Sequence, residues 1–344
     1  MIKVGLIGCG KIAQVRHIPE YEANGESKLY GFFDQNYERA EMLAKQYGAK
    51  VYASYEEMLA DPEIDAVSVL TPNVTHGVIT VAALKAGKHV LCEKPMAVTI
   101  QECEQMIQAA EESGKKLMIA QNQRLTEAHK KVKELLGQGI IGKIITFHTV
   151  FAHKGADNWS IDGKNSWFLD KNKSCFGALA DLGVHKTDLM IYLLDSKIDK
   201  VSSIIGTLDK KDEHGKPISV DDNAFCTYHM ENGAMGTMQV GWTNYGKEEN
   251  ITSLYGTLGA IHIYRNPDHA IEVELKDGTA SYYDVDQIQT NDHQTSTGVI
   301  DTFIDAIRKD QEPEISAKKV LPAMKAIFAC VESAKENGKM IPVL

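Results

Sequence analysis

Short apolar runs alternate with stretches of helical period over the first 120 residues. Such alternation predicts parallel strands joined by helices, that is, an α/β Rossmann domain with a doubly wound parallel sheet. We expect this domain to span residues 1–122. The expected strands are Ile2–Ile7, Lys28–Asp34, Lys50–Ala53, Ala66–Leu70, His89–Cys92 and Lys116–Ala120, and the expected helices are 13–24, 36–47, 75–86 and 99–113.

The pattern changes after Gln121. A helix over 127–138 and a strand over 143–152 precede a long loop, and a helix over 177–195 follows it. Strand-like runs come next, with hairpin signals at Asn232-Gly233 and Asp277-Gly278, before closing helices over 299–309 and 317–337. We predict an α+β domain over 123–344, with a large open, mainly antiparallel sheet that serves substrate binding and oligomerisation.

Composition and charge narrow the partners. The 344 residues carry a formal net charge of −10, so no overall basic field attracts nucleic acid. No apolar run reaches the roughly 18 residues of a membrane-spanning helix. Six cysteines lie apart without a CxxC pair, which suits a reducing compartment. We expect a cytoplasmic protein without nucleic-acid or membrane partners, and a homodimer or homotetramer, because an open sheet face would be half exposed in a monomer.

A dinucleotide signature follows the first expected strand. The segment Gly8-Cys9-Gly10-Lys11-Ile12-Ala13 reads GxGxxA and opens a helix, whose N-terminus favours a pyrophosphate. The motif alone also fits a tight strand-to-helix turn. Asp34 ends the second strand 21 residues after Ala13, where a carboxylate accepts the ribose hydroxyls and repels a 2′-phosphate. We therefore predict NAD in preference to NADP, with Arg39 solvated rather than bound to a phosphate.

Further motifs, in order, are Thr71-Pro72-Asn73 with His76, Glu93-Lys94-Pro95, and Asp181-Leu182-Gly183-Val184-His185 with Asp188. With the GxGxxA segment and Asp34, this ordered set resembles the glucose-fructose oxidoreductase, inositol dehydrogenase and MocA (Gfo/Idh/MocA) family over essentially the whole chain. The resemblance implies an NAD(P)-dependent oxidoreductase of a sugar, polyol or related hydroxyl compound. It implies catalytic roles for Lys94, Asp181 and His185, and cofactor contacts from Thr71, Pro72, Asn73, His76, Glu93 and Lys94.

Three segments depart from the family pattern. Phe176-Gly177-Ala178 stands where many members carry three glycines, and Asn122-Gln123-Arg124-Leu125 stands in place of a usual Asn-Arg-Arg-Phe. The loop over 157–173 is longer than is usual.

The spacing of the polar residues suggests a mechanism. Lys94 lies two residues beyond a central strand, where ligands of doubly wound sheets bind. Asp181, His185 and Asp188 share one face of a helix at i, i+4 and i+7. We hypothesise that His185, oriented by Asp181 and with a pKa near 6.5, is the general base, while Lys94 stabilises the alkoxide. The alternatives are a half-exposed helix face and a metal-binding trio; hydride transfer with a lysine present requires no metal.

Substrate contacts are expected from Lys94, Asn122, Arg124, His153, Trp167, His185 and Asp188, with Trp159 as a further stacking residue. The tryptophans could instead fill a core, and Arg124 could form an ion pair between domains. Two rival functions stay open. One is an NAD-dependent glycoside hydrolase that uses transient oxidation, and the other is a non-catalytic, NAD-sensing regulator.

Overall fold

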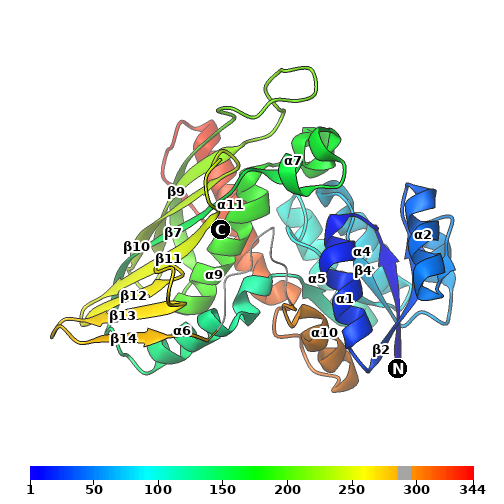
Figure 1. Ribbon diagram of the computed structural model, residues 1–344, viewed down its shortest axis with the longest axis horizontal. Coiled ribbons are helices and arrows are strands. Elements are labelled where there is room, and N and C mark those ends of the chain that lie inside the picture. The colour runs from blue at the N-terminus through cyan, green and yellow to red at the C-terminus, as the bar shows by residue number, and fades with distance from the viewer. Residues whose placement is uncertain (286–295) are drawn as a thin grey trace.

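The computed structural model of the protein describes residues 1–285 and 296–344 (Figure 1). A parallel sheet of six strands, in the order β3-β2-β1-β4-β5-β6, forms the first half, as predicted. Its strands are β1 (Ile2–Ile7), β2 (Ser27–Phe33), β3 (Lys50–Val51), β4 (Ala66–Val69), β5 (His89–Cys92) and β6 (Leu117–Ile119). Strands β1, β4 and β5 are almost entirely apolar and buried, as strands covered on both faces must be.

Helices connect these strands. They are α1 (Ile18–Ala23), α2 (Tyr37–Tyr47), α3 (Tyr55–Ala60), α4 (His76–Lys85) and α5 (Ile100–Ser113). Asn36, Ser54 and Thr99 cap α2, α3 and α5 by accepting a backbone N–H of the first turn. The sequence pattern did not predict α3, which is only six residues long. The helix expected over 13–24 begins instead as a π-helical turn, η1 (Ala13–His17), that continues into α1.

The second sheet contains nine strands in the described residues, ordered β14-β13-β12-β11-β7-β10-β9-β8-β15. They are β7 (Ile144–Ala152), β8 (Ile198–Gly206), β9 (Asn223–Met230), β10 (Met235–Gly241), β11 (Glu249–Gly256), β12 (Gly259–Ile263), β13 (Ile271–Leu275), β14 (Ala280–Tyr283) and β15 (Ile341–Pro342). Adjacent strands are antiparallel except β7 and β10, which are parallel. Both predicted hairpins form, at Asn232-Gly233 and Asp277-Gly278. The predicted mainly antiparallel sheet is therefore confirmed.

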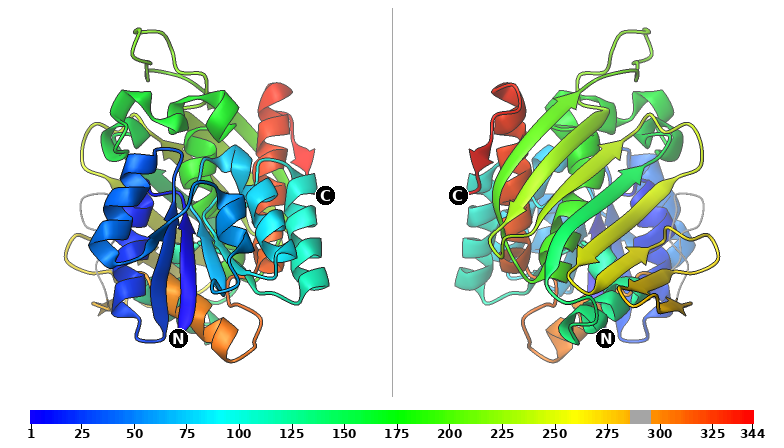
Figure 2. Two further views of the ribbon diagram at one scale, coloured as in Figure 1. Left: turned by 90° about the vertical axis from the view of Figure 1, so that its right-hand side faces the viewer. Right: turned by 90° about the vertical axis from the view of Figure 1, so that its left-hand side faces the viewer.

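One face of this sheet is covered and the other is open. Helices α6 (Glu127–Gly137), α9 (Val184–Leu194) and α11 (Ala317–Lys335) lie on the side of the first domain. The opposite face is turned to the viewer in the right panel of Figure 2, and no helix of the described chain lies over it. It carries the exposed apolar side chains Ile145, Ile204, Phe225, Met235 and Tyr255.

The chain returns to the first domain before it ends. Helix α10 (Val299–Arg308) packs near α1, and the backbone N–H of Ile119 donates to the Ile315 carbonyl at 3.0 Å. Met118 and Ser316 form a further β-bridge. Residues assigned by sequence to the second domain thus contact the first sheet, and the division at residue 122 stays a prediction.

Two further observations concern single segments. Gly177, before the long helix, has no room for a side chain, because an added Cβ would lie 1.8 Å from the Asp221 carbonyl oxygen. The middle glycine of the family run is thus required on steric grounds. No helix within residues 1–285 or 296–344 combines the length and apolar character needed to cross a membrane.

Candidate active site

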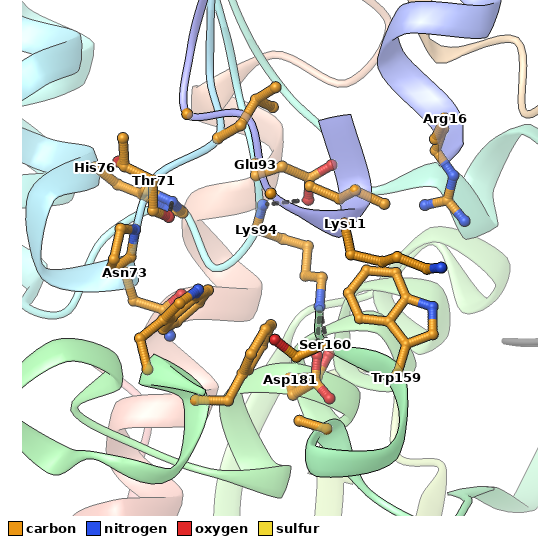
Figure 3. A pocket seen from close by; sticks show the side chains of 18 of the residues that line it. Lys11, Arg16, Thr71, Asn73, His76, Glu93, Lys94, Trp159, Ser160 and Asp181 are labelled. Carbon is orange, nitrogen blue, oxygen red and sulfur yellow. Dashed lines mark hydrogen bonds and ion pairs between the residues drawn. The ribbon is translucent and has the colours of Figure 1, made fainter. Parts of the chain in front are cut away.

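A cavity of about 760 Å³ lies between the two sheets, bordered by the carboxyl ends of the first-sheet strands and by the segment that follows β7. Figure 3 shows side chains from both domains converging in it. The sequence-predicted residues that line it are Gly8, Gly10, Lys11, Ile12, Asp34, Thr71, Pro72, Asn73, His76, Glu93, Lys94, Asn122, His153, Trp167, Asp181 and His185. Ala13, Arg124 and Asp188 are not among the described lining residues.

The glycine-rich turn has the shape that a pyrophosphate requires. Gly8 has a φ of +103°, and a Cβ added there would lie 2.5 Å from the Leu70 carbonyl oxygen. A Cβ added to Gly10 would meet nothing within 4 Å, so this backbone faces open space at the cavity wall. Ala13 is fully buried under the helix start. These residues fit the phosphates of a dinucleotide.

Asp34 lines the cavity and is held by the backbone. Its Oδ2 accepts the Cys9 N–H at 2.7 Å, and its Oδ1 accepts the Asn36 N–H at 2.8 Å. Each oxygen keeps a second lone pair for a ribose hydroxyl. The prediction that Arg39 is solvated is wrong, because its guanidinium lies 3.1 Å from Asp162 and 3.9 Å from Asp34. A carboxylate from the other domain thus reaches the residue beside Asp34.

Glu93 and His76 fix the loops around the cavity. The Glu93 carboxylate accepts from His17 Nε2 at 3.0 Å, joining the end of β5 to η1. Burial opposes ionisation of Glu93, but the hydrogen bond and charge of His17, with Lys94 and Arg16 nearby, lower its pKa to about 2. The two ring nitrogens of His76 lie 2.7 and 2.9 Å from the carbonyl oxygens of Pro95 and Thr71. Both residues therefore shape the cavity wall through protein contacts.

Lys94 and Asp181 form an ion pair across the cavity (Figure 3). Lys94 Nζ donates to Asp181 Oδ1 at 2.7 Å and to the Asp181 carbonyl oxygen at 3.0 Å. Trp242, which the sequence did not single out, donates its indole N–H to Asp181 Oδ2 at 3.1 Å. Burial opposes the charge on Asp181, but Lys94, His153 and the two donors outweigh it and lower its pKa. This arrangement holds Lys94 Nζ against Asp181 at the cavity wall.

His185 lies on the same cavity wall without the expected partner. Its Nδ1 is buried and has no hydrogen-bond acceptor or donor among the described residues. Asp181 is bound to Lys94 and Trp242, so the hypothesis that it orients His185 is wrong. Burial, together with the charges of Lys94, Arg16 and Lys186, holds the pKa of His185 well below its usual value of 6.5. The imidazole is therefore neutral at pH 7, where it can accept a proton.

Arg124 and Asp188 pair with each other, away from the cavity lining. Asp188 accepts two hydrogen bonds from the guanidinium, at 2.6 and 2.5 Å, and both side chains are buried. The expectation that they contact substrate is corrected by this geometry. Arg124 does form an ion pair, but its partner belongs to the same predicted domain, 123–344, so the pair is not the one expected between domains. Because Asp181 and Asp188 each bind a cation, they do not meet His185 as a metal trio; no such cluster occurs in the described residues.

The long segment after β7 contributes aromatic residues to the cavity. It contains the short helices α7 (Ala156–Trp159), η4 (Gly163–Asn165), η5 (Trp167–Leu169) and α8 (Lys171–Ser174) rather than a structureless loop. Trp167 stacks on Phe168 with centroids 3.9 Å apart. Trp159 also lines the cavity (Figure 3). His153 accepts the Gly155 N–H at 2.9 Å and keeps one face toward the cavity.

Other lining residues were missed by sequence reasoning. On the side of the second sheet and α6 they include Gln123, His129, Phe151, Glu248, Asn250 and Tyr264. His129 lies on the buried side of an amphipathic helix, where a histidine carries no local signal of a ligand. Gln123 replaces an arginine of the usual family pattern, which is the one signal that could have drawn attention to it.

Two family models match this chain. One, described as an oxidoreductase family with an NAD-binding Rossmann fold, matches residues 2–121. The other, described as the GFO/IDH/MocA C-terminal domain, matches residues 129–262. The two matches together cover most of the chain.

Curated relatives include levoglucosan dehydrogenase of Pseudarthrobacter phenanthrenivorans, which is 31% identical over 66% of this chain and 63% of that enzyme. The chain thus matches less than two thirds of that enzyme's length. Glucose-6-phosphate 3-dehydrogenase of Bacillus subtilis is 31% identical over 67% of this chain and 65% of its own. A solved levoglucosan dehydrogenase in complex with NADH has a TM-score of 0.85 at 24% identity, covering 100% of this chain and 99% of that one. This last likeness concerns the fold alone.

Proposed function

Because the chain belongs to the Gfo/Idh/MocA family of oxidoreductases, we propose that it transfers a hydride between a nicotinamide cofactor and a hydroxyl or carbonyl carbon of a sugar, inositol or related polyol. The observation that carries this proposal is the meeting of the Lys94–Asp181 pair and a neutral His185 in the cavity that the glycine-rich turn also lines.

Each of the three residues has a distinct role in this proposal. A bound nicotinamide would supply the acceptor for the hydride that leaves the substrate carbon. Neutral His185 takes the proton of the substrate hydroxyl, and the protonated imidazole returns it in the reverse direction. Lys94 donates a hydrogen bond to the same oxygen and stabilises its negative charge. Asp181 positions Lys94 by an ion pair of 2.7 Å.

We infer that NAD is preferred to NADP. Asp34 places a negative charge beside the expected ribose site, where a 2′-phosphate would be repelled. Arg39 does not offset this repulsion, because two carboxylates already surround its guanidinium.

The cytoplasm is the proposed compartment, since the cysteines are free and mostly buried.

We also propose a homodimer or homotetramer that covers the open face of the nine-stranded sheet. Five neighbouring strands present large apolar side chains there, among them Ile204 at 71% and Phe225 at 43% exposure. Large exposed apolar side chains on several strands of one sheet face are typical of an association site.

The test is absorbance at 340 nm with the purified protein, NAD or NADP, and a panel of inositols, aldoses, sugar acids and glycosides. Reduction of NAD by one of these compounds is expected. The variants Lys94→Met and His185→Ala should each lose roughly 10²–10⁴-fold in turnover, the usual contribution of a proton-transfer group or oxyanion donor. Lys130→Met, which changes an exposed lysine on α6, is the control.

Near-normal turnover in both active-site variants would contradict the assignment of roles. Release of an aglycone from a glycoside without net reduction of NAD would contradict the dehydrogenase and favour the hydrolase. Saturable sugar binding without any turnover would favour the sensor.

A further inference from the structure

We propose that the end of the cavity formed by Gln123, His129 and Asn250 is a substrate subsite that accepts hydrogen bonds from the hydroxyls of a neutral, unphosphorylated polyol or sugar. These three residues are called the acceptor end below. The inference rests on the proposed function, which it deepens by naming the chemical class of the substrate.

His129 is an acceptor because of how its ring is held. Its Nδ1 lies 2.7 Å from both the Gln123 carbonyl oxygen and Thr126 Oγ1. The hydroxyl could donate or accept, but the carbonyl can only accept, so Nδ1 carries the hydrogen. Burial, with the charge of Lys186, lowers the pKa of His129 to about 3, which keeps the ring neutral. The remaining nitrogen, Nε2, therefore offers a lone pair. It is buried and has no partner among the described residues, and the side chain lines the cavity.

Gln123 and Asn250, the other two residues of the acceptor end, each have a buried side-chain oxygen without a hydrogen-bond partner in the described part of the chain. Gln123 is 6% exposed and Asn250 is 8% exposed. Gln123 Oε1 and Asn250 Oδ1 are buried without a hydrogen-bond partner among the described residues, and both side chains line the cavity. A buried polar atom without a partner costs free energy, so three of them on residues that line one cavity point to a ligand that donates to them.

The acceptor end adjoins the reacting groups. Asn250 on β11 lies opposite Phe151 on β7 in the strand register. The ring of Phe151 lies 6.3 Å from the ring of His185, centroid to centroid. A ring-shaped substrate with one hydroxyl at His185 and Lys94 would therefore direct other hydroxyls toward Asn250, Gln123 and His129.

Charge distinguishes a neutral substrate from a phosphorylated one. The lining cations Lys11, Arg16 and Arg39 belong to the first domain, Lys94 is paired with Asp181, and Lys173 lies on α8, which packs against the first domain. Within the described residues, no lysine or arginine from α6 or the second sheet lines the cavity, whereas the carboxylate Glu248 does.

The nearest cation behind this wall is unsuited to a phosphate. Lys186 is fully buried, does not line the cavity, and directs Nζ to the Ile251 carbonyl oxygen at 3.4 Å and to Thr252 Oγ1 at 3.3 Å. A phosphate dianion at the acceptor end would thus lose its hydration without gaining a cation. Hydroxyl groups, in contrast, supply the missing donors.

The experiment measures binding separately from turnover. Calorimetric titration of the NADH-loaded protein uses myo-inositol, levoglucosan and methyl glucoside as neutral probes, and glucose 6-phosphate and inorganic phosphate as charged ones. We expect at least about tenfold weaker binding of the charged probes. The variants Gln123→Met, His129→Phe and Asn250→Leu keep the approximate shape and remove the acceptor. Each should weaken the neutral probe roughly 3–10-fold, the usual contribution of one hydrogen bond, and leave the Kd of NADH unchanged. Gln101→Met, on the exposed side of α5, is the matched control.

Deoxy analogues make the test independent of folding defects. If an acceptor binds a given hydroxyl, the deoxy analogue that lacks this hydroxyl should bind the unchanged protein more weakly than the parent sugar does. The variant that lacks the acceptor should bind the analogue and the parent sugar with equal affinity. Equal binding of neutral and phosphorylated probes, or variants that bind the neutral probes unchanged, would overturn the inference. Neutral binding without reduction of NAD would support it and contradict the proposed function. Reduction of NAD by a sugar phosphate, and by no neutral sugar or polyol, would support the proposed function and contradict the inference.

Discussion

The neutral state of His185 is decided by its surroundings in the folded protein, among which only Lys186 is a neighbour in sequence. Burial and the positive charges of Lys94, Arg16 and Lys186 all disfavour the imidazolium. These groups come from three separate elements: η1, the end of β5 and α9. The helix pattern places His185 on the correct face but assigns it an ordinary pKa, because the pattern does not show how deeply the ring is buried and because two of the three charges, Lys94 and Arg16, lie far away in the chain.

The first residue-scale prediction follows from the sign of this shift. A base with a lowered pKa stays unprotonated further into the acid range, so kcat/KM for oxidation should stay level from pH 8 to below 6.5 and fall only at lower pH. A pH–rate profile measures this directly. Lys186→Met removes one of the three charges that depress the pKa of His185, and should move the acid limb to higher pH. An acid limb at pH 6.5 or above in the unchanged protein would contradict this account.

The second residue-scale prediction concerns cofactor choice. Asp34→Ser removes the carboxylate that is expected to bind the ribose hydroxyls, so the preference for NAD over NADP should fall by roughly 10–100-fold, the usual effect of losing hydrogen bonds to a charged group. Ratios of kcat/KM for the two cofactors measure it. Glu38→Gln, which changes an exposed carboxylate on α2, is the control. If the ratio of kcat/KM for NAD and NADP is unchanged in Asp34→Ser, Asp34 does not bind the ribose hydroxyls.

At the scale of elements, the helix that carries Asp181, His185 and Asp188 forms two ion pairs, one at the cavity with Lys94 and one away from it with Arg124. Its first turn, η6 (Leu179–Gly183), is π-helical and delivers Asp181 to Lys94. Its later turn delivers Asp188 to Arg124, which follows β6. Periodicity alone identifies the shared face. It could not identify the partners, because each comes from a segment about 60 to 90 residues away in the chain.

The element-scale prediction concerns the Arg124–Asp188 pair. Asp188→Asn should destabilise the protein by about 3–5 kcal/mol, because it leaves a buried guanidinium without its carboxylate. The double variant Arg124→Met with Asp188→Leu, which removes both charges, should recover most of this loss. Urea unfolding measures all three proteins. Equal loss in the single and double variants would show that packing rather than the ion pair holds these elements together.

For the molecule as a whole, the sequence was sufficient to predict the two sheet types, their order and the glycine-rich turn. These features depend on local periodicity and turn residues. The return of residues 297–316 to the first sheet was not predictable in this way. Thr297 donates to Glu20 and Ile315 accepts from Ile119, and these contacts join residues separated by about 200 or more positions.

The whole-molecule prediction concerns the open sheet face. Light scattering should give a mass of at least twice the 38.0 kDa of the chain at micromolar concentration. Phe225→Asp places a charge on that face and should shift the mass toward 38.0 kDa. Met42→Asp, at another exposed apolar side chain on α2, should not. A mass of 38.0 kDa for the unchanged protein would overturn the proposed assembly.

Residues 315–342 complete both sheets: Ser316 bridges to β6, α11 packs on β8 and α5, and β15 pairs with β8. During synthesis on the ribosome, these residues emerge after every other strand. The apolar surfaces of β8 and α5 therefore stay uncovered until translation has passed residue 342, so the two domains mature together rather than one after the other. A nascent chain that stalls before residue 315 would leave these apolar surfaces exposed, and chaperones bind surfaces of this kind. Its glycine-rich turn would already have been synthesised.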